Sequence, residues 1–228
     1  MRSVVTRDAE IEFVATEPEV VEYPQLNSFA YALKGVFDRV AAALLLVVLA
    51  IPMLVIAALI KLTSPGAVLI GQERVGRYGH PFTFYKFRSM LADAELLRDQ
   101  LEDHNHHDAK HIFKIKRDPR ITRIGGMLRR TSLDELPNLF NVLKGELSLV
   151  GPRPPLPREV AHYDDYHMQR LVAMPGLTGL WQIRGRSEIP FEKMVDMDLE
   201  YVRRWSLWLD LTIILKTPLA VIRGRGAW

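Results

Sequence analysis

The sequence predicts an α+β fold that is mostly helical, a single membrane-associated domain with a re-entrant membrane helix, a small β-hairpin and C-terminal interfacial helices. Three observations predict it. Residues 40–60 form the only long run without a charged side chain, two short alternating segments flank a turn at 76–79, and much of the rest has helical spacing. The chain accordingly divides into an acidic mobile tail (1–33), the membrane helix (34–63) and a folded domain (64–228).

Charge is unevenly distributed along the chain. Residues 1–33 hold two basic and six acidic side chains, a balance of −4 against +3 for the whole chain, so the remainder carries +7. The positive net charge of the residues after 33 favours anionic partners such as phospholipid head groups, nucleotides or nucleic acid. The chain has no cysteine, which excludes disulfides and thiolate chemistry. The first residues do not resemble a signal peptide, because the apolar run starts too late.

The apolar run of residues 40–60 predicts a membrane helix. A helix of this length measures about 31 Å, just enough to cross the hydrocarbon core. Basic residues lie before and after the run, with Lys34 and Arg39 before it. The distribution of positive charge therefore does not show which end of the helix faces the cytoplasm. A helix that breaks at Pro52 and returns to its own face keeps both basic flanks together. A kinked single span is the alternative.

A second membrane signal lies in residues 201–228, where tryptophans and basic residues surround the apolar run 207–222. Asp210 and Pro218 interrupt that run, so it is a poor transmembrane helix. Aromatic and basic residues beside an apolar face are typical of an interfacial helix. A packed core helix with a basic tail is the alternative.

The folded domain begins with a turn at Ser64, Pro65 and Gly66. Residues 68–73 and 81–88 then alternate in polarity around the turn at 76–79, which predicts a β-hairpin.

The rest of the domain is predicted mostly helical, with helices at 90–102 and 191–204 and a turn-rich loop at 175–182. Four histidines fall within 104–111, but their local spacing and the absence of cysteine favour an exposed loop over a zinc site. Residues 113–130 are basic enough for a nucleic-acid patch, yet they run into two carboxylates that would repel a phosphate backbone.

Those carboxylates, Asp134 and Glu135, stand where a helix is expected to begin. Ser132 and Glu135 match a capping box, but Pro137 would then lie too deep in the helix. We therefore predict Asp134 as the N-cap and Gly145 as the end of the helix. The positive end of the helix dipole should then favour the ionised form of Asp134.

An ionised, positioned carboxylate can attack a phosphoryl group and form an acyl phosphate. The attack brings two anions together, so it needs a metal ion and cationic side chains. Glu135 is the candidate metal ligand, and Mg²⁺ is the expected ion because the ligands are hard oxygens. Cations on the hairpin and a guanidinium held between prolines are candidate phosphate or substrate ligands: Lys86, Arg88, Pro152, Arg153 and Pro154.

Several motifs together resemble the bacterial sugar transferases, the monotopic polyprenyl-phosphate phosphoglycosyl transferases. The motifs are Tyr85–Met90, Thr131–Pro154, Pro175–Gly179, Gly185–Arg186 and Trp205–Asp210. The resemblance covers residues 34–228. It implies transfer of a hexose-1-phosphate from a UDP-sugar to undecaprenyl phosphate, with release of UMP, as the first membrane step of exopolysaccharide, capsule or O-antigen synthesis.

The resemblance also implies roles for individual residues. Asp134 would be the nucleophile of a two-step reaction through a covalent aspartyl phosphosugar, and Glu135 the Mg²⁺ ligand. Further site residues carried over from the family's motifs are Lys86, Arg153, Arg186 and Asp198.

The family's membrane helix is re-entrant and broken at a Ser-Pro pair, whereas Ile51 precedes Pro52 here. The implied location is the bacterial inner membrane, with the catalytic domain on the cytoplasmic face. Larger relatives carry an N-terminal bundle of membrane helices, which we expect to be absent here, because only about 33 residues precede the apolar helix.

The expected partners are a UDP-sugar, undecaprenyl phosphate and the bilayer, without nucleic acid; a homo-oligomer is compatible with the sequence. A membrane-anchored Mg²⁺-dependent phosphohydrolase and a binding module for anionic polymers are the alternative functions. The sugar is left open, with glucose or galactose preferred from the Trp-x-x-Trp-Leu-Asp motif.

Overall fold

The computed structural model describes residues 28–91 and 118–224, together with Tyr23, Leu26, Ala94, Leu97, Ile115 and Gly226. Most of the predicted acidic tail, most of the helix predicted at 90–102, the histidine segment 104–111 and most of residues 113–117 lie outside the described residues. Within them, the expectation of a mostly helical fold with a small antiparallel hairpin and C-terminal helices is confirmed.

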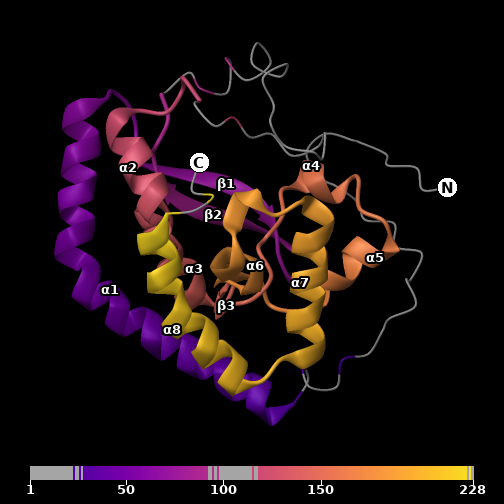
Figure 1. The fold of residues 1–228 in the computed structure, drawn as a ribbon. Coiled ribbons are helices and arrows are strands. Elements are labelled where there is room, and N and C mark those ends of the chain that lie inside the picture. The colour runs from indigo at the N-terminus through magenta and orange to yellow at the C-terminus, as the bar shows by residue number, and fades with distance from the viewer. Residues whose placement is uncertain are drawn as a thin grey trace.

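Helix α1 (Phe29–Thr63) is the apolar helix that the sequence predicts. The side chain of Ser28 accepts a hydrogen bond from the Tyr31 amide and caps its start. The helix thus begins five residues before the expected boundary at 34. Its hydrogen bonding continues past Pro52, and its axis bends part-way along (Figure 1).

The hairpin is confirmed as strands β1 (Leu69–Val75) and β2 (Pro81–Phe87), which pair antiparallel. A short 3-10 turn, η2 (Arg77–Gly79), connects them, with Tyr78 in the left-handed region at φ 55°.

After the hairpin along the chain come α2 (Arg123–Thr131), the 3-10 helix η4 (Leu133–Asn138) and α3 (Leu139–Lys144). Strand β3 (Ser148–Val150) then pairs parallel with β4 (Gly176–Thr178). The predicted loop at 175–182 is therefore wrong in part, since it contains β4 and the start of α6. The remaining elements are α4 (Pro157–Val160), α5 (Asp165–Met168), η5 (Gln169–Val172), α6 (Leu180–Arg184), η6 (Arg186–Glu188), α7 (Phe191–Arg204) and α8 (Leu207–Arg223).

Helix α1 packs on the rest of the molecule along its whole length (Figure 1). Near its middle, Ala42 lies in a cluster with residues of β2 and α3. Towards its end, Ile56 and Ile60 pack on Phe87 of β2 and Leu128 of α2. One stripe of the apolar helix therefore belongs to the core of the domain.

A buried polar cluster fixes the first turns of α1; we call it the anchor cluster. Lys34 forms ion pairs with Asp38 at 3.1 Å and with Asp210 of α8 at 2.8 Å. Ser148 of β3 donates to Asp38 at 2.6 Å, and Tyr201 of α7 donates to Asp210 at 2.8 Å. Each charge in the cluster thus has a partner of opposite sign or a hydrogen-bond donor.

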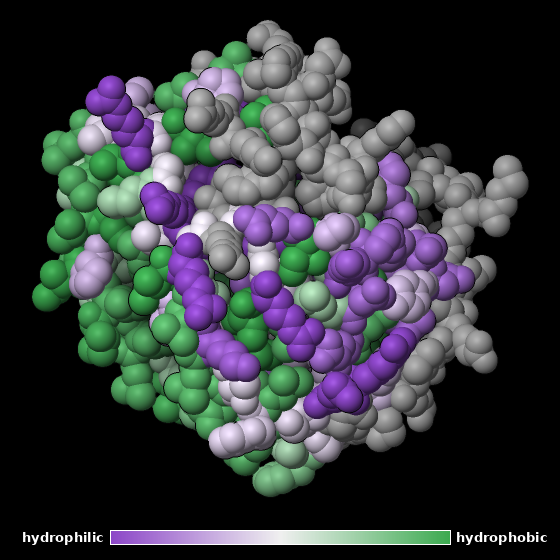
Figure 2. All heavy atoms as spheres, in the orientation of Figure 1, coloured by the Kyte–Doolittle hydropathy of each residue, from purple (hydrophilic) through white to green (hydrophobic). Residues whose placement is uncertain are grey.

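The opposite stripe of α1 is exposed and apolar. Val47, Ile51 and Leu62 are each more than 70% exposed, and Trp208 and Ile222 of α8 are similarly exposed. Figure 2 shows hydrophobic side chains gathered over α1, while hydrophilic side chains cover the region of α6 and α7. By length and composition, α1 is the one helix among the described residues that could cross a membrane.

Candidate active site

The acidic pair lies in η4, which follows a left-handed residue. Ser132 has φ 57° and precedes the helix without a side-chain capping bond. Asp134 is the second residue of η4, so the prediction of Asp134 as N-cap is wrong, and Ser132, the alternative set aside because of Pro137, occupies the N-cap position. The reason is Pro137, which lies inside this tighter helix, with α3 continuing directly to Gly145 at φ 85°. The predicted helix end at Gly145 is confirmed.

Two buried asparagines join η4 and α3 to the hairpin. The Tyr85 amide of β2 donates to Asn138 Oδ1 at 2.9 Å, and Asn141 Nδ2 donates to the Thr83 carbonyl at 2.7 Å. Asn138 also donates to the Glu135 carbonyl at 3.2 Å. Because both amides are fully buried, they hold strand β2 and the acidic pair at a fixed separation.

Asp134 is buried, with 8% of its surface exposed. Its pKa is raised to about 6, first by burial and then by the Glu135 carboxylate, against the lowering effects of Lys86 and Arg129. The expectation that the helix start favours its ionised form is therefore wrong, because a 3-10 helix of six residues does not offset the loss of water. The group still titrates below neutral pH and is mostly ionised at pH 7.

Lys86 of β2 faces the acidic pair. Burial first and then Arg74 lower the pKa of Lys86 to about 7, while Glu135 and Asp134 act in the opposite direction. Its ammonium lies 5.2 Å from the Phe84 ring and forms no hydrogen bond or ion pair with the residues that the structure describes. A half-buried cation without a bonded anion, beside two carboxylates, is typical of a site that receives an anionic ligand.

Arg186 is a second cation near the acidic pair. Its guanidinium donates to Ser132 Oγ and to the Arg130 carbonyl. Glu135 and Asp134 both act to raise its pKa, although burial lowers it overall. Arg186 itself has φ 54°, so two left-handed non-glycine residues, Ser132 and Arg186, meet beside the carboxylates. Such backbone strain is concentrated at functional sites.

The segment from Pro152 to Pro155 holds Arg153 rigidly. Each of its four carbonyls accepts a hydrogen bond, in order from the Gly176 amide (2.9 Å), Arg170 Nη2 (3.4 Å), Arg74 Nη1 (2.9 Å) and the Val75 amide (2.9 Å). Pro152 and Pro154 are buried, whereas Arg153 is half-buried. The Arg153 guanidinium forms no hydrogen bond or ion pair within the described part of the chain. Its charge lowers the pKa of Lys86, so the two cations are neighbours.

Asp198 of α7 is fully buried and forms an ion pair with Arg170. Burial raises the pKa of Asp198 to about 6, against the lowering effect of Arg170. Arg170 also donates to the Tyr163 hydroxyl at 3.0 Å and to the Arg153 carbonyl. These contacts give Asp198 a positioning role behind Arg153. The direct catalytic role expected for it stays a prediction.

Arg88 contacts the end of α1. Its Nη2 donates to the carbonyl and to the hydroxyl of Ser64, each at 2.8 Å. It therefore joins the hairpin to α1, and its expected contact with substrate stays a prediction.

The acidic pair fits a magnesium ion that is bound together with a phosphate. No group of three or more potential metal-binding side chains gathers within the described residues. Asp134 and Glu135 supply two adjacent carboxylates, and their mutual repulsion raises the pKa of Asp134. Mg²⁺ is usually bound through one or two carboxylates plus water and substrate phosphates.

Sequence reasoning missed four buried residues that build this site: Asn138, Asn141, Glu159 and Arg170. Glu159 lies among cations, and Arg153 and Arg74 lower its pKa against the effect of burial. The two asparagines could have been found, since amides three residues apart inside an apolar helical stretch need buried partners. Glu159 and Arg170 carry no comparable local signal.

Comparisons with known proteins agree on one family. The model of a family described as bacterial sugar transferase matches residues 29–224. The galactosyl transferase CpsE of Streptococcus agalactiae is 49% identical over 163 residues, which cover 71% of this chain and 36% of that protein. The undecaprenyl-phosphate galactose phosphotransferase of Salmonella typhimurium is 43% identical over 199 residues, which cover 86% and 42%.

A shorter relative matches over nearly its whole length. The exopolysaccharide production protein ExoY of Rhizobium meliloti is 39% identical over 198 residues, which cover 86% of this chain and 88% of that protein. The chain thus spans less than half of the length of the first two relatives and most of the third.

Proposed function

The chain belongs to the bacterial sugar transferase family, and from this premise we propose that it transfers a hexose-1-phosphate from a UDP-sugar to undecaprenyl phosphate and releases UMP. The observation that carries the proposal is the surrounding of Asp134. A buried carboxylate titrates near pH 6 beside a second carboxylate, with Arg186 and a lysine that has no bonded anion in the described part of the chain as its cationic neighbours. Two relatives named for galactose support galactose as the sugar, with glucose the alternative.

In the first step, an ionised oxygen of Asp134 attacks the phosphorus that bears the sugar. The bond between this phosphorus and the oxygen bridging to the second phosphorus breaks, and UMP leaves with the electron pair. The product is a mixed anhydride between the Asp134 carboxyl and the sugar phosphate. Burial raises the basicity of the Asp134 carboxylate, which strengthens it as a nucleophile.

In the second step, an oxygen of undecaprenyl phosphate attacks the same phosphorus. The acyl–phosphate bond breaks, the carboxylate of Asp134 is restored, and the sugar becomes linked to the lipid through a diphosphate. Each step exchanges one phosphorus–oxygen bond for another, so no oxidant or additional reactant is required.

The cations supply the charge that both steps need. Protonated Lys86 and the rigid guanidinium of Arg153 would bind the phosphate oxygens, on which negative charge accumulates during attack. Arg186 would hold Ser132 in place and would thereby fix the backbone that leads into Asp134. Glu135, with Asp134, would hold Mg²⁺, which would neutralise the diphosphate when bound.

Membrane association follows from the exposed apolar faces of α1 and α8. The two ends of α1 contact the same domain, at Asp210 through Lys34 and at Arg88 through Ser64. A helix crossing the bilayer would leave its ends on opposite sides, whereas a re-entrant helix keeps both beside one domain. These contacts support re-entrant insertion, and we place the catalytic domain on the cytoplasmic face of the inner membrane because the family resemblance implies that location.

The test is an assay of the purified protein with undecaprenyl phosphate, Mg²⁺ and a panel of UDP-sugars. We expect UMP release and a lipid-linked sugar diphosphate, both abolished by EDTA. With UDP-sugar alone, we expect stoichiometric UMP and a sugar-phosphorylated peptide containing Asp134 by mass spectrometry. Release of free sugar phosphate would instead identify a hydrolase, and UMP formation only after lipid addition would contradict the covalent step.

A further inference from the structure

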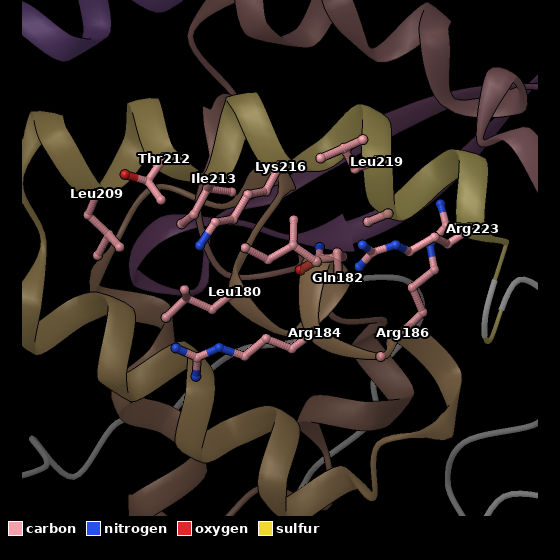
Figure 3. A pocket seen from close by; sticks show the side chains of 13 residues that line it. Leu180, Gln182, Arg184, Arg186, Leu209, Thr212, Ile213, Lys216, Leu219 and Arg223 are labelled. Carbon is pink, nitrogen blue, oxygen red and sulfur yellow. The ribbon is translucent and has the colours of Figure 1, made fainter.

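A pocket of about 480 Å³ lies between α6 and α8, beside the candidate active site. Figure 3 shows the side chains that line it, with Leu209 and Thr212 towards one end of α8 and Arg223 at the other, near Arg186. Arg186 also donates to Ser132 next to the acidic pair. One end of the pocket is therefore joined to the site by a single side chain.

The lining of the pocket is basic and contains no acidic residue. Arg184 is neutralised by Glu200, at 2.7 Å, and Arg186 is bound to Ser132. Lys216 and Arg223 form no hydrogen bond or ion pair with any residue that the structure describes. Two uncompensated cations on one helix attract an anion.

Apart from Gln182, Gly185 and Thr212, the rest of the lining is aliphatic and follows the length of α8. Leu180 and Ile183 come from α6, and Leu209, Ile213 and Leu219 from α8. From Leu209 to Arg223 the helix rises about 21 Å. Figure 3 shows the Lys216 side chain turned towards Leu209 and Leu180, whereas Arg223 lies beside Arg186. The pocket therefore combines aliphatic side chains along its length with a cation towards each end, and its lining holds no aromatic ring on which a nucleotide base could stack.

The other face of α8 is exposed and apolar, with Trp208 75% and Ile222 81% exposed. An amphipathic helix of this kind lies at the surface of a bilayer. A ligand beneath it would then have direct access to lipid at one end and to the carboxylates at the other.

We propose that this pocket binds the lipid acceptor, a phosphate monoester on a long hydrocarbon chain. Arg223, beside Arg186, binds the phosphate, Lys216 adds positive charge farther along the pocket, and the aliphatic lining holds the first carbons of the chain. Arg186 lies between the pocket and the acidic pair, on the path that the acceptor phosphate would take to reach Asp134. The inference rests on the proposed function and extends it, because it assigns acceptor binding to α8, separate from the residues assigned to the donor diphosphate.

The test compares the KM values for the two substrates in neutral detergent micelles, with undecaprenyl phosphate as the only anionic lipid. In the double variant Lys216→Gln/Arg223→Gln, we expect the KM for undecaprenyl phosphate to rise at least tenfold and the KM for the UDP-sugar to change less than twofold. Ala220→Phe fills the pocket without changing its charge, and the same selective rise is expected. Lys193→Gln removes an exposed cation of α7 outside the pocket and should leave both values unchanged.

An unchanged acceptor KM in the double variant and in Ala220→Phe would overturn the proposal. A rise confined to the UDP-sugar KM would also overturn it, because the pocket would then serve the donor. If phosphatidylglycerol at a concentration equal to that of undecaprenyl phosphate competed with it and inhibited the wild type, the pocket would be a general anionic-lipid site. That result would overturn the assignment of the pocket to the acceptor. Lack of any turnover by the wild type would instead refute the proposed function itself.

Discussion

Two groups of charged residues differ in how their charges are balanced. In the anchor cluster, Lys34 lies between Asp38 and Asp210, and hydroxyl donors bond both carboxylates. In the candidate active site, Lys86 and Arg153 have no bonded anion among the described residues, and Asp134 lies beside a second carboxylate. The first group fixes where α1 sits, and the second leaves charge available for a ligand.

This difference in charge pairing predicts different consequences for stability and for ligand binding. A fully paired cluster is costly to disrupt, because removing one member leaves an uncompensated buried charge. An incompletely paired site costs stability, and that cost is offset when an anionic substrate and a cation bind. Substitutions in the two groups should therefore affect different properties, folding in one and turnover in the other.

The largest effect is expected for Asp134→Asn. The amide is nearly the same size but cannot form the acyl phosphate, so kcat should fall about a thousandfold or more. Stability should not fall, because burial already disfavours the charge that the substitution removes. The measurements are UMP release and the denaturation midpoint. A variant with more than a tenth of wild-type turnover would show that another group is the nucleophile.

Lys34→Met should affect folding rather than chemistry. It leaves Asp38 and Asp210 facing each other without a cation, and the free energy of unfolding should drop by about 3–5 kcal/mol. Chemical denaturation in detergent measures this. Lys61→Met, at an exposed position of the same helix, should change stability by no more than about 0.5 kcal/mol. Equal effects in the two variants would mean that the anchor cluster does not fix α1.

The pH dependence should reveal the incompletely paired site. Because the pKa of Asp134 is raised to about 6 and that of Lys86 is lowered to about 7, kcat/KM for the UDP-sugar should rise through pH 6 and decline above pH 7. Because Asp134 and Lys86 interact, these two pKa values describe the titration of the pair and not of either group alone. Lys86→Met should lower the rate and remove the alkaline decline; persistence of that decline would assign it to another group.

The same shift has a consequence for stability. The folded-state pKa of Asp134 lies above its ordinary value, so the folded protein binds this proton more tightly than the unfolded chain. This residue therefore costs stability above about pH 6, and the cost disappears as the pH falls towards 4. Asp134→Asn should flatten that part of the curve of stability against pH.

The smallest effect is expected at Ser132. Ser132→Ala loses the acceptor of Arg186 and keeps the unfavourable left-handed backbone, which should cost about 1 kcal/mol. Ser132→Gly loses the same acceptor but relieves the strain, so its net effect should be close to zero. Denaturation midpoints of the two variants give the difference. An alanine variant as stable as the glycine variant would show that the backbone at Ser132 is unstrained.

Local sequence signals predicted the elements that depend on local interactions. The hairpin followed from alternating segments around Gly76 and Gly79, and α7 has the predicted bounds of 191–204. The parallel pair β3–β4 was missed because strands of three residues, 26 positions apart between Val150 and Gly176, leave no periodic pattern.

The candidate site was predictable only in part. Lys86, Arg186 and the acidic pair could be grouped through the family's motifs, and the structure brings them together. The raised pKa of Asp134 was not predictable, because it depends on how much water the folded chain excludes. The position of Arg88 at the end of α1 was likewise missed, since it follows from packing between segments distant in sequence.

The attachment of α1 at both ends bears on attempts to make a soluble enzyme by truncation. Deleting residues up to Thr63 would uncover the apolar side chains of Phe84, Phe87 and Leu128 and would leave Asp210 without its lysine. The shortened polypeptide would expose a new apolar surface and would not become more soluble. Polar replacements confined to the outward stripe of the helix, around Val47 and Ile51, are the better route to expression without detergent.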